Sequence, residues 1–391
     1  MKKGFSLFVF SLLSSLYVLA FNNIKVGADQ PEKYLSLINN KRVALVINHT
    51  SCRTNGAHLL DVLVSDGVNV TKIFAPEHGF RGNADAGEKI VNGKDVRTGL
   101  PVVSLYGKTK RPTPEMLADV DIVIFDIQDV GARFYTYIST MHYVMEACAE
   151  NNKPLIILDR PNPNDYIDGP VLKLPYKSFV GMHPIPVLHG LTVGELAQMI
   201  NGEGWLRSSG KCDLTVIQVE GWKHRQKYSL PIKPSPNLPN DQAIRLYPSL
   251  CFFEATNVSV GRGTYYPFQV IGYPDSRFGA FTFTPVSLEG FDKNPLQKDK
   301  LCYGIDLRNV KLSSGDGLSL EYLIQFYKIS GQGARFFKSP KFMNMLAGSA
   351  QLQKQILSGM SESAIRKTWE KDISQYMKIR RKYLLYSDFY D

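Results

Sequence analysis

Carboxylates, arginines and aromatic residues gather in two glycine-bearing stretches of this 391-residue chain. The first stretch, residues 75–88, contains Glu77 and Glu88, and the second, residues 126–137, contains Asp129. Each follows an apolar run typical of a buried β-strand. Because the loops that leave the carboxyl ends of parallel strands meet at one edge of a sheet, we expect the two stretches to face each other across a cleft.

The chemistry that these residue types favour is cleavage of a glycosidic bond. That reaction usually needs two carboxyl groups, one protonated as an acid and one ionised as a base or nucleophile. Carboxyl groups that share a partly dry cleft acquire different pKa values, which supplies both states at neutral pH. We therefore predict Glu77, Glu88 and Asp129 as catalytic residues. His78 either assists proton transfer or hydrogen-bonds its neighbours, and Asp126, directly after its strand, is expected to be structural.

A second group of residues suits substrate binding. The planar guanidinium groups of Arg81 and Arg133 can hold a carboxylate through two hydrogen bonds. Tyr135 can stack on the face of a sugar. Asn237 lies in a proline-rich segment, residues 234–239, which we expect to be stiff and to form one wall of the cleft.

Other catalytic signatures are missing from the sequence. Gly261 and Gly263 lack the third glycine of a dinucleotide-binding loop and come too late in the chain. Residues 82–89 have the spacing of a phosphate-binding loop, but Glu88 stands where that loop needs lysine and would repel phosphate. Neither a G-x-S-x-G elbow nor an H-E-x-x-H motif occurs. We predict no cofactor and no metal, although the many oxygen ligands keep a divalent cation as an alternative.

Strands and helices alternate through the first half of the chain. We predict strands at residues 42–47, 68–75, 101–106, 121–125, 154–158 and 214–219, and helices at 58–65, 114–119, 139–150 and 192–200. The helix at 58–65 has Leu59, Leu60, Leu63 and Val64 on its apolar face. Thr192 and Glu195 have the spacing of a capping box. This order predicts an α/β fold, a Rossmann-like doubly wound parallel sheet.

The alternation of predicted strands and helices becomes irregular after about residue 260. We predict strands at 279–284 and 303–307 and helices at 318–327 and 362–376. The predicted domains are therefore a signal peptide at 1–20, a Rossmann-like domain at 21–259 and a smaller C-terminal α+β domain at 260–391.

The signal peptide is indicated by Lys2 and Lys3, which precede an apolar run that ends in a small-residue cleavage site at Ala20. Since the run of about sixteen residues is short for a bilayer span, an uncleaved anchor is the weaker alternative. We expect export and no stable membrane insertion after cleavage.

The net charge limits the classes of binding partner, and the cysteine content bears on whether disulfides stabilise the fold. The net charge of +10 is spread along the chain, which suits solubility or an anionic polymer such as cell wall. The basic runs lack the aromatic interleaving of nucleic-acid binders. Five isolated cysteines argue against a disulfide scaffold, and we expect Cys148 and Cys251 to be core residues.

Several long motifs resemble those of the NamZ-type exo-β-N-acetylmuramidase family. They include Ala-Pro-Glu-His-Gly-Phe-Arg-Gly at 75–82, the stretch at 126–137, Leu-Asp-Arg-Pro-Asn-Pro at 158–163, Pro-Ser-Pro-Asn-Leu-Pro at 234–239, Tyr-Pro-Ser-Leu-Cys-Phe-Phe-Glu at 247–254, Asn-Val-Ser-Val-Gly-Arg-Gly-Thr at 257–264 and Arg-Arg-Lys-Tyr-Leu-Leu-Tyr at 380–386. The similarity covers nearly the whole chain after the predicted signal peptide. Ala255 and Tyr273 depart from the pattern, where glycine and alanine are expected, and both departures bear on the outer shape of the cleft.

The resemblance implies an exported bacterial enzyme, periplasmic or extracellular, that releases N-acetylmuramic acid from the non-reducing ends of peptidoglycan fragments. It implies a cleft between the two domains, with Glu77 as the best catalytic candidate and Glu88 or Asp129 as its partner. Muramic acid carries a lactyl carboxylate, which Arg81 or Arg133 would clamp. The expected partners are peptidoglycan-derived muropeptides or disaccharides. Two alternatives stay open: a non-catalytic muropeptide-binding protein and a metal-dependent hydrolase of another bond.

Overall fold

The computed structural model describes residues 24–80, 92–207, 210–311 and 317–388. The predicted signal peptide and the candidates Arg81 and Glu88 lie outside these residues. Within the described ranges, no helix has both the length and the apolar composition needed to cross a membrane.

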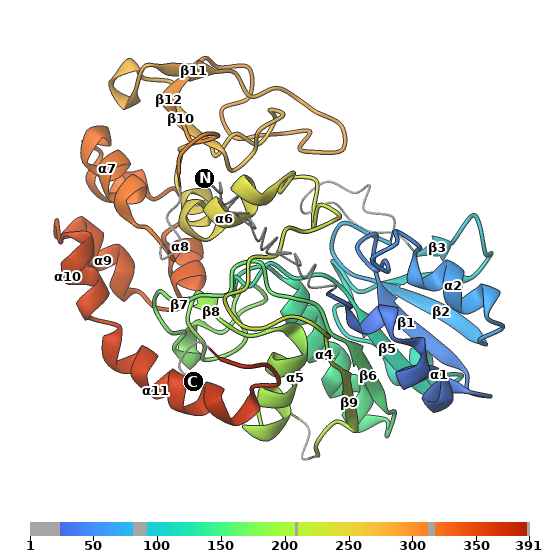
Figure 1. Ribbon diagram of the computed structural model, residues 1–391. Coiled ribbons are helices and arrows are strands. Elements are labelled where there is room, and N and C mark those ends of the chain that lie inside the picture. Colours follow the sequence, from blue (N-terminus) through green and yellow to red (C-terminus); the bar gives the residue numbers. More distant parts are fainter. Residues whose placement is uncertain (1–23, 81–91, 208–209, 312–316, 389–391) are drawn as a thin grey trace, which may run out of the picture.

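A seven-stranded sheet forms the centre of the N-terminal part, in the order β3-β4-β2-β1-β5-β6-β9 (Figure 1). Every neighbouring pair is parallel except β3 and β4. The strands are β1 (Val43–Ile47), β2 (Val70–Ala75), β3 (Gly93–Lys94), β4 (Pro101–Ser104), β5 (Ile122–Asp126), β6 (Leu155–Leu158) and β9 (Leu214–Ile217). The predicted Rossmann-like sheet is confirmed, and the connections reverse direction between β1 and β5.

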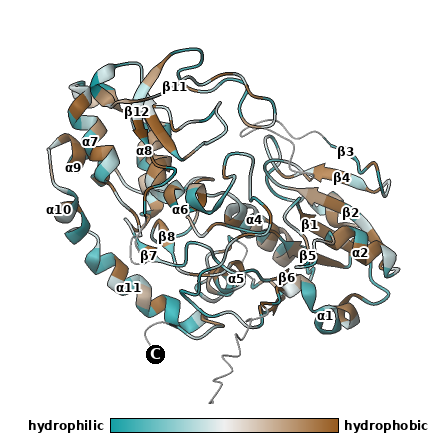
Figure 2. Ribbon diagram, turned by 45° about the horizontal axis from the view of Figure 1, so that its top comes forward, coloured by the Kyte–Doolittle hydropathy of each residue, from teal (hydrophilic) through white to brown (hydrophobic). Residues whose placement is uncertain are grey.

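Helices cover both faces of this sheet, which explains why its central strands β1 and β6 are continuously apolar. In β1, Val43, Leu45 and Ile47 face the helices α1 (Pro31–Ile38) and α2 (Leu59–Ser65). Ala44 and Val46 belong to the opposite core, beside α4 (Tyr137–Glu150) and α5 (Val193–Gly202). The central strands β1 and β5 are accordingly largely brown in the hydropathy view (Figure 2).

Two local predictions have different outcomes. The capping box is confirmed, because Thr192 Oγ1 accepts from Glu195 N at 3.2 Å and Glu195 Oε2 accepts from Thr192 N at 2.9 Å. The apolar face of α2 was predicted one residue too wide. Val64 lies at the solvent side with 41% of its surface exposed, since the sheet is reached only by Leu59, Leu60 and Leu63.

The C-terminal part is an α+β unit, as predicted. Its antiparallel sheet has the order β10-β12-β11. Its elements are β10 (Val270–Tyr273), β11 (Phe281–Phe283), β12 (Cys302–Asp306), α7 (Glu321–Ser330), α8 (Pro340–Ala347), α9 (Gln351–Leu357), α10 (Glu362–Lys367) and α11 (Glu370–Arg380). We count with it α6 (Asp241–Leu250) and the residues that follow, which lie before the predicted boundary at residue 259. The N-terminal part also contains the short helix α3 (Pro114–Leu117). Two short strands of this part, β7 (Ile167–Asp168) and β8 (Leu188–His189), form a separate antiparallel pair.

The single helix predicted at 362–376 is instead two helices. The Thr368 hydroxyl donates to the Ile365 carbonyl at 2.6 Å, a local bond that competes with helix continuation. Trp369, the next residue, is only 5% exposed. The break therefore lets the chain turn a large aromatic side chain into the core.

The end of the chain returns to the N-terminal part (Figure 1). Arg380 Nε donates to the Gly190 carbonyl at 2.7 Å, and the Tyr386 hydroxyl donates to Asp159 Oδ2 at 2.6 Å. Because Asp159 and Tyr386 are both buried, these bonds tie the two parts together in a water-poor environment.

The predicted core cysteines are confirmed. Cys148 and Cys251 are each 1% exposed, and all five cysteines are buried free thiols.

Candidate active site

A cavity of about 300 Å³ lies where the loops of the N-terminal sheet meet the C-terminal part. Its walls come from four sources: the loops after β2, β4 and β5, the segment between β7 and β8, the proline-rich segment, and the C-terminal part. The polar side chains in these walls are those of Glu77, His78, Tyr106, Tyr135, Thr136, Tyr137, Ser235, Asn237, Tyr247, Glu254 and Arg262.

Glu77 is delivered to this cavity by a tight turn after β2. Gly79 N donates to the Pro76 carbonyl at 3.1 Å. His78 has φ +66°, a left-handed conformation uncommon for histidine, and Gly79 follows with φ +73°. Strained backbone of this kind is typical of functional sites, where surrounding structure holds it. The turn leaves Glu77 half-buried and His78 almost fully buried, at 7% exposure.

The two acidic stretches do meet, as predicted. Thr136 Oγ1, from the loop after β5, donates to Glu77 Oε2 at 2.7 Å. Tyr106 lines the same cavity, and its phenol pKa is raised by burial, by the charge of Glu77 and by a hydrogen bond to it. Burial and the charge of Glu77 also raise the pKa of Tyr137. Glu77 therefore lies among neutral hydroxyl groups that can orient its carboxyl group.

The proline-rich segment forms a wall of the cavity through Ser235, Asn237 and Leu238. The Tyr135 hydroxyl holds this wall by donating to the Pro234 carbonyl at 2.9 Å. Asn237 is 2% exposed and its Nδ2 donates to the Phe291 carbonyl at 2.9 Å. Both predicted binding residues thus lie in the cavity.

Glu254 and Arg262 add an ion pair to the cavity that the sequence reasoning did not single out. Glu254 lies in the short 3-10 helix η3 (Cys251–Ala255). Its Oε1 accepts from Arg262 Nε at 2.8 Å and lies 2.7 Å from Nη2. Neither residue follows a strand of the parallel sheet, so a search for polar residues at strand ends passes over them. Their signal was their place in two of the family-like motifs.

The two departures from the family pattern do not alter this cavity. Ala255 is fully buried and follows Glu254 in the chain. Tyr273, the last residue of β10, packs against the ring of Phe278, with the two ring centroids 5.3 Å apart. Neither side chain lines the walls.

Asp129 is not brought into the cavity of Glu77. It is 4% exposed and lines a separate space of about 10 Å³, room for roughly one water. Its Oδ1 accepts from Gly131 N at 2.8 Å, whereas its Oδ2 has no hydrogen-bond donor among the described residues. Burial raises the pKa of Asp129 to about 7, against the opposing effect of backbone donors.

Asp129→Asn is expected to stabilise the protein above neutral pH. Because the folded pKa lies above the ordinary value, the stability that protonation of Asp129 contributes is complete below about pH 4 and is lost as pH rises through about 7. Asparagine stays neutral, so we expect a gain of about 2–4 kcal/mol at pH 8 and little change at pH 4. Urea unfolding at both pH values measures this, with exposed Asp213→Asn as the matched control. An equal effect at both pH values would contradict the burial of a carboxyl group with a raised pKa.

Arg133 also lies away from the cavity. Its guanidinium is fully buried, with Nη1 donating at 2.7 Å to the carbonyls of Pro170 and Ile185 and Nη2 donating at 2.7 Å to that of Leu346. Burial lowers its pKa to about 9. The placement favours a structural role that joins the two parts over the predicted contact with a substrate carboxylate.

Arg133→Met is expected to lower the free energy of unfolding by about 3 kcal/mol, because three buried carbonyl groups lose their donor. If the role is structural, KM of the folded protein stays unchanged. Thermal unfolding and steady-state kinetics on the same preparation separate the two effects, with the exposed Arg335→Met as control. A raised KM with unchanged stability would restore the substrate-binding role.

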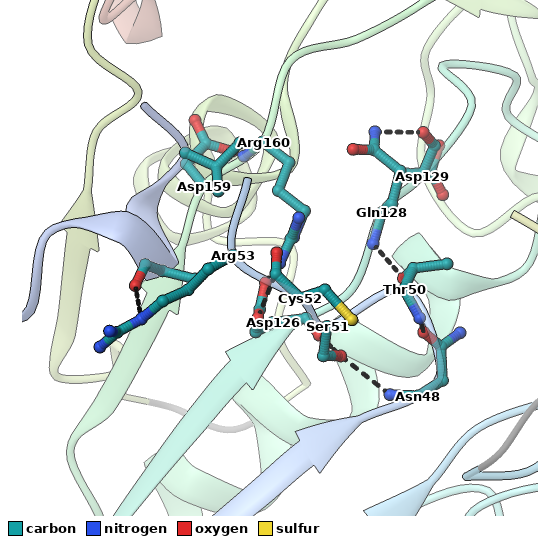
Figure 3. A network of polar contacts seen from close by, with 12 residues as sticks. Asn48, Thr50, Ser51, Cys52, Arg53, Asp126, Gln128, Asp129, Asp159 and Arg160 are labelled. Atoms are coloured by element: carbon teal, nitrogen blue, oxygen red, sulfur yellow. Dashed lines mark hydrogen bonds and ion pairs between the residues drawn. The ribbon is translucent and has the colours of Figure 1, made fainter. Parts of the chain in front are cut away.

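The crevice at the reversal between β1 and β5, where nucleotides bind in many Rossmann-like folds, is occupied by side chains of the protein itself (Figure 3). Arg160 Nε and Nη2 donate to Asp126 Oδ1 and Oδ2 at 2.5 and 2.9 Å. The Ser51 hydroxyl donates to the Asp126 carbonyl, and the Thr50 hydroxyl to Asn48 Oδ1. Asp126 is therefore structural, as predicted.

No group of three or more histidine, cysteine, aspartate or glutamate side chains within the described ranges is arranged to hold a metal ion.

The chain thus joins a Rossmann-like domain to a smaller α+β unit, and glutamate and aromatic side chains line the cavity between them. Two family models match the chain: the N-terminal domain of the exo-β-N-acetylmuramidase NamZ at residues 43–242 and its C-terminal domain at residues 245–386. The chain belongs to this NamZ family, and it is an enzyme of the glycosidase class.

Individual relatives agree with the family assignment. The peptidoglycan β-N-acetylmuramidase NamZ of Bacillus subtilis is 39% identical over 379 residues, 90% of this chain and 89% of that protein. Two DUF1343 family proteins of Bacteroides fragilis have similar crystal structures. The first is 47% identical to this chain, with a TM-score of 0.86, and the match covers 94% of this chain and 99% of that protein's chain. The second is 31% identical to this chain, with a TM-score of 0.80, and the match covers 93% of this chain and 99% of that protein's chain.

Proposed function

We propose that this enzyme releases N-acetylmuramic acid from the non-reducing ends of peptidoglycan fragments, with Glu77 as the catalytic acid/base. The observation that carries the proposal is the position of Glu77, half-buried in a cavity between the two parts and bonded to Thr136. The aromatic walls suit the apolar face of a sugar ring. Membership of the NamZ family supports the substrate, since the B. subtilis relative acts on peptidoglycan.

The proposed chemistry is proton transfer to the glycosidic oxygen. A protonated Glu77 would give its proton to the leaving oxygen as the glycosidic bond breaks, and an ionised partner carboxylate would act at the anomeric carbon. If that partner attacks the carbon as a nucleophile, the ionised Glu77 then takes a proton from the water that displaces it; if the partner is a base, it takes that proton itself. The hydroxyl groups of Thr136 and Tyr106 restrict the rotation of the Glu77 side chain, which keeps it aligned with the scissile bond. Glu88 stays the predicted partner from the sequence, whereas Asp129 lines a separate space and is not proposed as a partner. The cavity itself contributes a second described carboxylate, Glu254, but Arg262 already occupies one of its oxygens.

The test is release of N-acetylmuramic acid from a MurNAc–GlcNAc disaccharide and from 4-nitrophenyl N-acetylmuramide. Turnover of both, with the free sugar as product, is the expected result. Tight binding of the disaccharide without turnover would favour the muropeptide-binding alternative. Activity that disappears with chelator and returns with a divalent cation would favour the metal-dependent alternative.

We also propose that the chain is exported, on the basis of Lys2, Lys3 and the apolar run up to Ala20. The mass of the mature N-terminus, measured on protein from the extracytoplasmic fraction of the cell of origin, tests this. An intact Met1 in the cytoplasmic fraction would contradict it.

A further inference from the structure

We propose that Arg262 binds the lactyl carboxylate of the terminal N-acetylmuramic acid and thereby distinguishes this sugar from N-acetylglucosamine. This inference rests on the proposed function and deepens it. The two sugars differ only by the lactyl ether, so a residue that recognises the carboxylate sets the specificity of the enzyme.

The backbone around Arg262 is fixed in one conformation. Gly261 and Gly263 both have φ +78°, a left-handed conformation that glycine adopts without strain. A Cβ atom on Gly261 would lie 2.6 Å from Val270 Cγ2, and one on Gly263 would lie 2.4 Å from Pro295 Cγ. Two tightly packed glycines therefore hold the arginine that lies between them at the cavity.

The guanidinium of Arg262 is only partly used by the protein. Its Nε and Nη2 both contact a single oxygen, Oε1 of Glu254. The Arg262 side chain is 20% exposed. Nη1 is buried and has no acceptor among the described residues. The group also lies over the ring of Phe268, 5.1 Å from its centroid. A buried charged donor without an acceptor is costly, and the edge formed by Nη1 and Nη2 has the geometry to hold a carboxylate through two hydrogen bonds.

A second unpaired polar atom complements the first. Asn237 Oδ1 is buried in the same cavity and has no donor among the described residues. The cavity thus offers one donor edge and one acceptor that the protein leaves unsatisfied. N-acetylmuramic acid supplies a carboxylate for the donor edge and hydroxyl or amide N–H groups for the acceptor, whereas N-acetylglucosamine supplies only the latter.

A second cavity next to Arg262 allows the proposed role of this arginine to be tested with the wild-type protein. Glu254 and Arg262 also line an adjoining cavity of about 560 Å³, together with residues such as Thr256 and Asp292. A methyl ester of the lactyl group therefore has room, and a loss of affinity on esterification reports the missing charge rather than a clash.

The experiment is a two-by-two comparison of protein and ligand. Wild type and Arg262→Lys are each assayed with 4-nitrophenyl N-acetylmuramide and with its lactyl methyl ester. Esterification is expected to lower kcat/KM of the wild type about 10- to 100-fold, but that of Arg262→Lys by less than about threefold. Lys341→Met, which removes an exposed cation of α8, should keep the wild-type ratio.

Binding of free N-acetylmuramic acid and N-acetylglucosamine, measured by calorimetry, separates this inference from the proposed function. If wild type cleaves the muramide but Arg262→Lys loses the same factor on acid and ester, the inference fails and the function stands. If wild type cleaves neither compound yet binds the muramic acid more tightly, and Arg262→Lys removes that difference, the inference stands and the function fails. Equal affinity of the wild type for acid and ester overturns the inference even if the variant does not fold.

Discussion

Replacement of Glu77 by glutamine is expected to lower kcat for release of N-acetylmuramic acid by about a hundredfold or more. Glutamine has the same shape and keeps one oxygen acceptor for the Thr136 hydroxyl, which donates to Glu77 at 2.7 Å in the structure. It cannot give up or take a proton at neutral pH. The change therefore removes the chemical step while leaving the walls of the cavity in place.

Substrate binding provides the internal control for this prediction. Affinity for a MurNAc–GlcNAc disaccharide should change by less than about threefold in Glu77→Gln, because an interaction made in the transition state is lost and not one of the ground state. The exposed Glu289→Gln should behave as wild type. Unchanged kcat in Glu77→Gln would transfer the catalytic role to another carboxylate of the cavity, for which Glu254→Gln is the next variant.

Loss of either member of the Asp126–Arg160 pair is expected to cost about 3–5 kcal/mol of folding stability. Asp126 is fully buried and Arg160 is 4% exposed, so removal of one leaves the other charged in a site without water. Arg160 Nη2 also donates to the Cys52 carbonyl at 2.9 Å, which ties the loops after β1 and β5 to the loop after β6. A marginally stable variant would lose the cavity along with this arrangement.

A double-mutant cycle with Asp126→Asn and Arg160→Met measures the coupling. The double variant should be clearly more stable than the sum of the two single losses, because no isolated charge remains. The pair of half-buried Asp306 and exposed Arg308, at 2.7 Å, serves as the solvent-accessible control with an expected loss below about 1 kcal/mol. Additive single losses would show that the two side chains act independently.

The sheet and the loops of the site could be predicted because their signals are local. Buried parallel strands such as β1 and β5 are short runs of branched apolar residues, and the position of Glu77 and Thr136 after such runs placed them on one edge. His78 and Asn237 followed from their neighbours in sequence. The division at residue 259 stays a prediction.

Residues whose role depends on distant partners were beyond the same reasoning. Arg133 looks like a binding residue in sequence, yet its three acceptors lie 37 to 213 positions away. Asp129 shares a loop with residues of the cavity, but the turn at Gly131 directs it to a separate space. Glu254 and Arg262 follow no strand, so only the folded C-terminal part brings them to Glu77.

The bond between Tyr386 and Asp159 has a consequence for the order in which the molecule is built. These residues are 227 positions apart, so the bond closes one of the longest loops in the chain. Asp159 lies directly after β6, and the Tyr386 hydroxyl is one of the donors that oppose the rise of its pKa by burial to about 6. A nascent chain that emerges N-terminus first therefore cannot form this bond until Tyr386 has been synthesised. Contacts of such high sequence separation are among the last to form, so we expect the contact between Tyr386 and Asp159 to form late in folding.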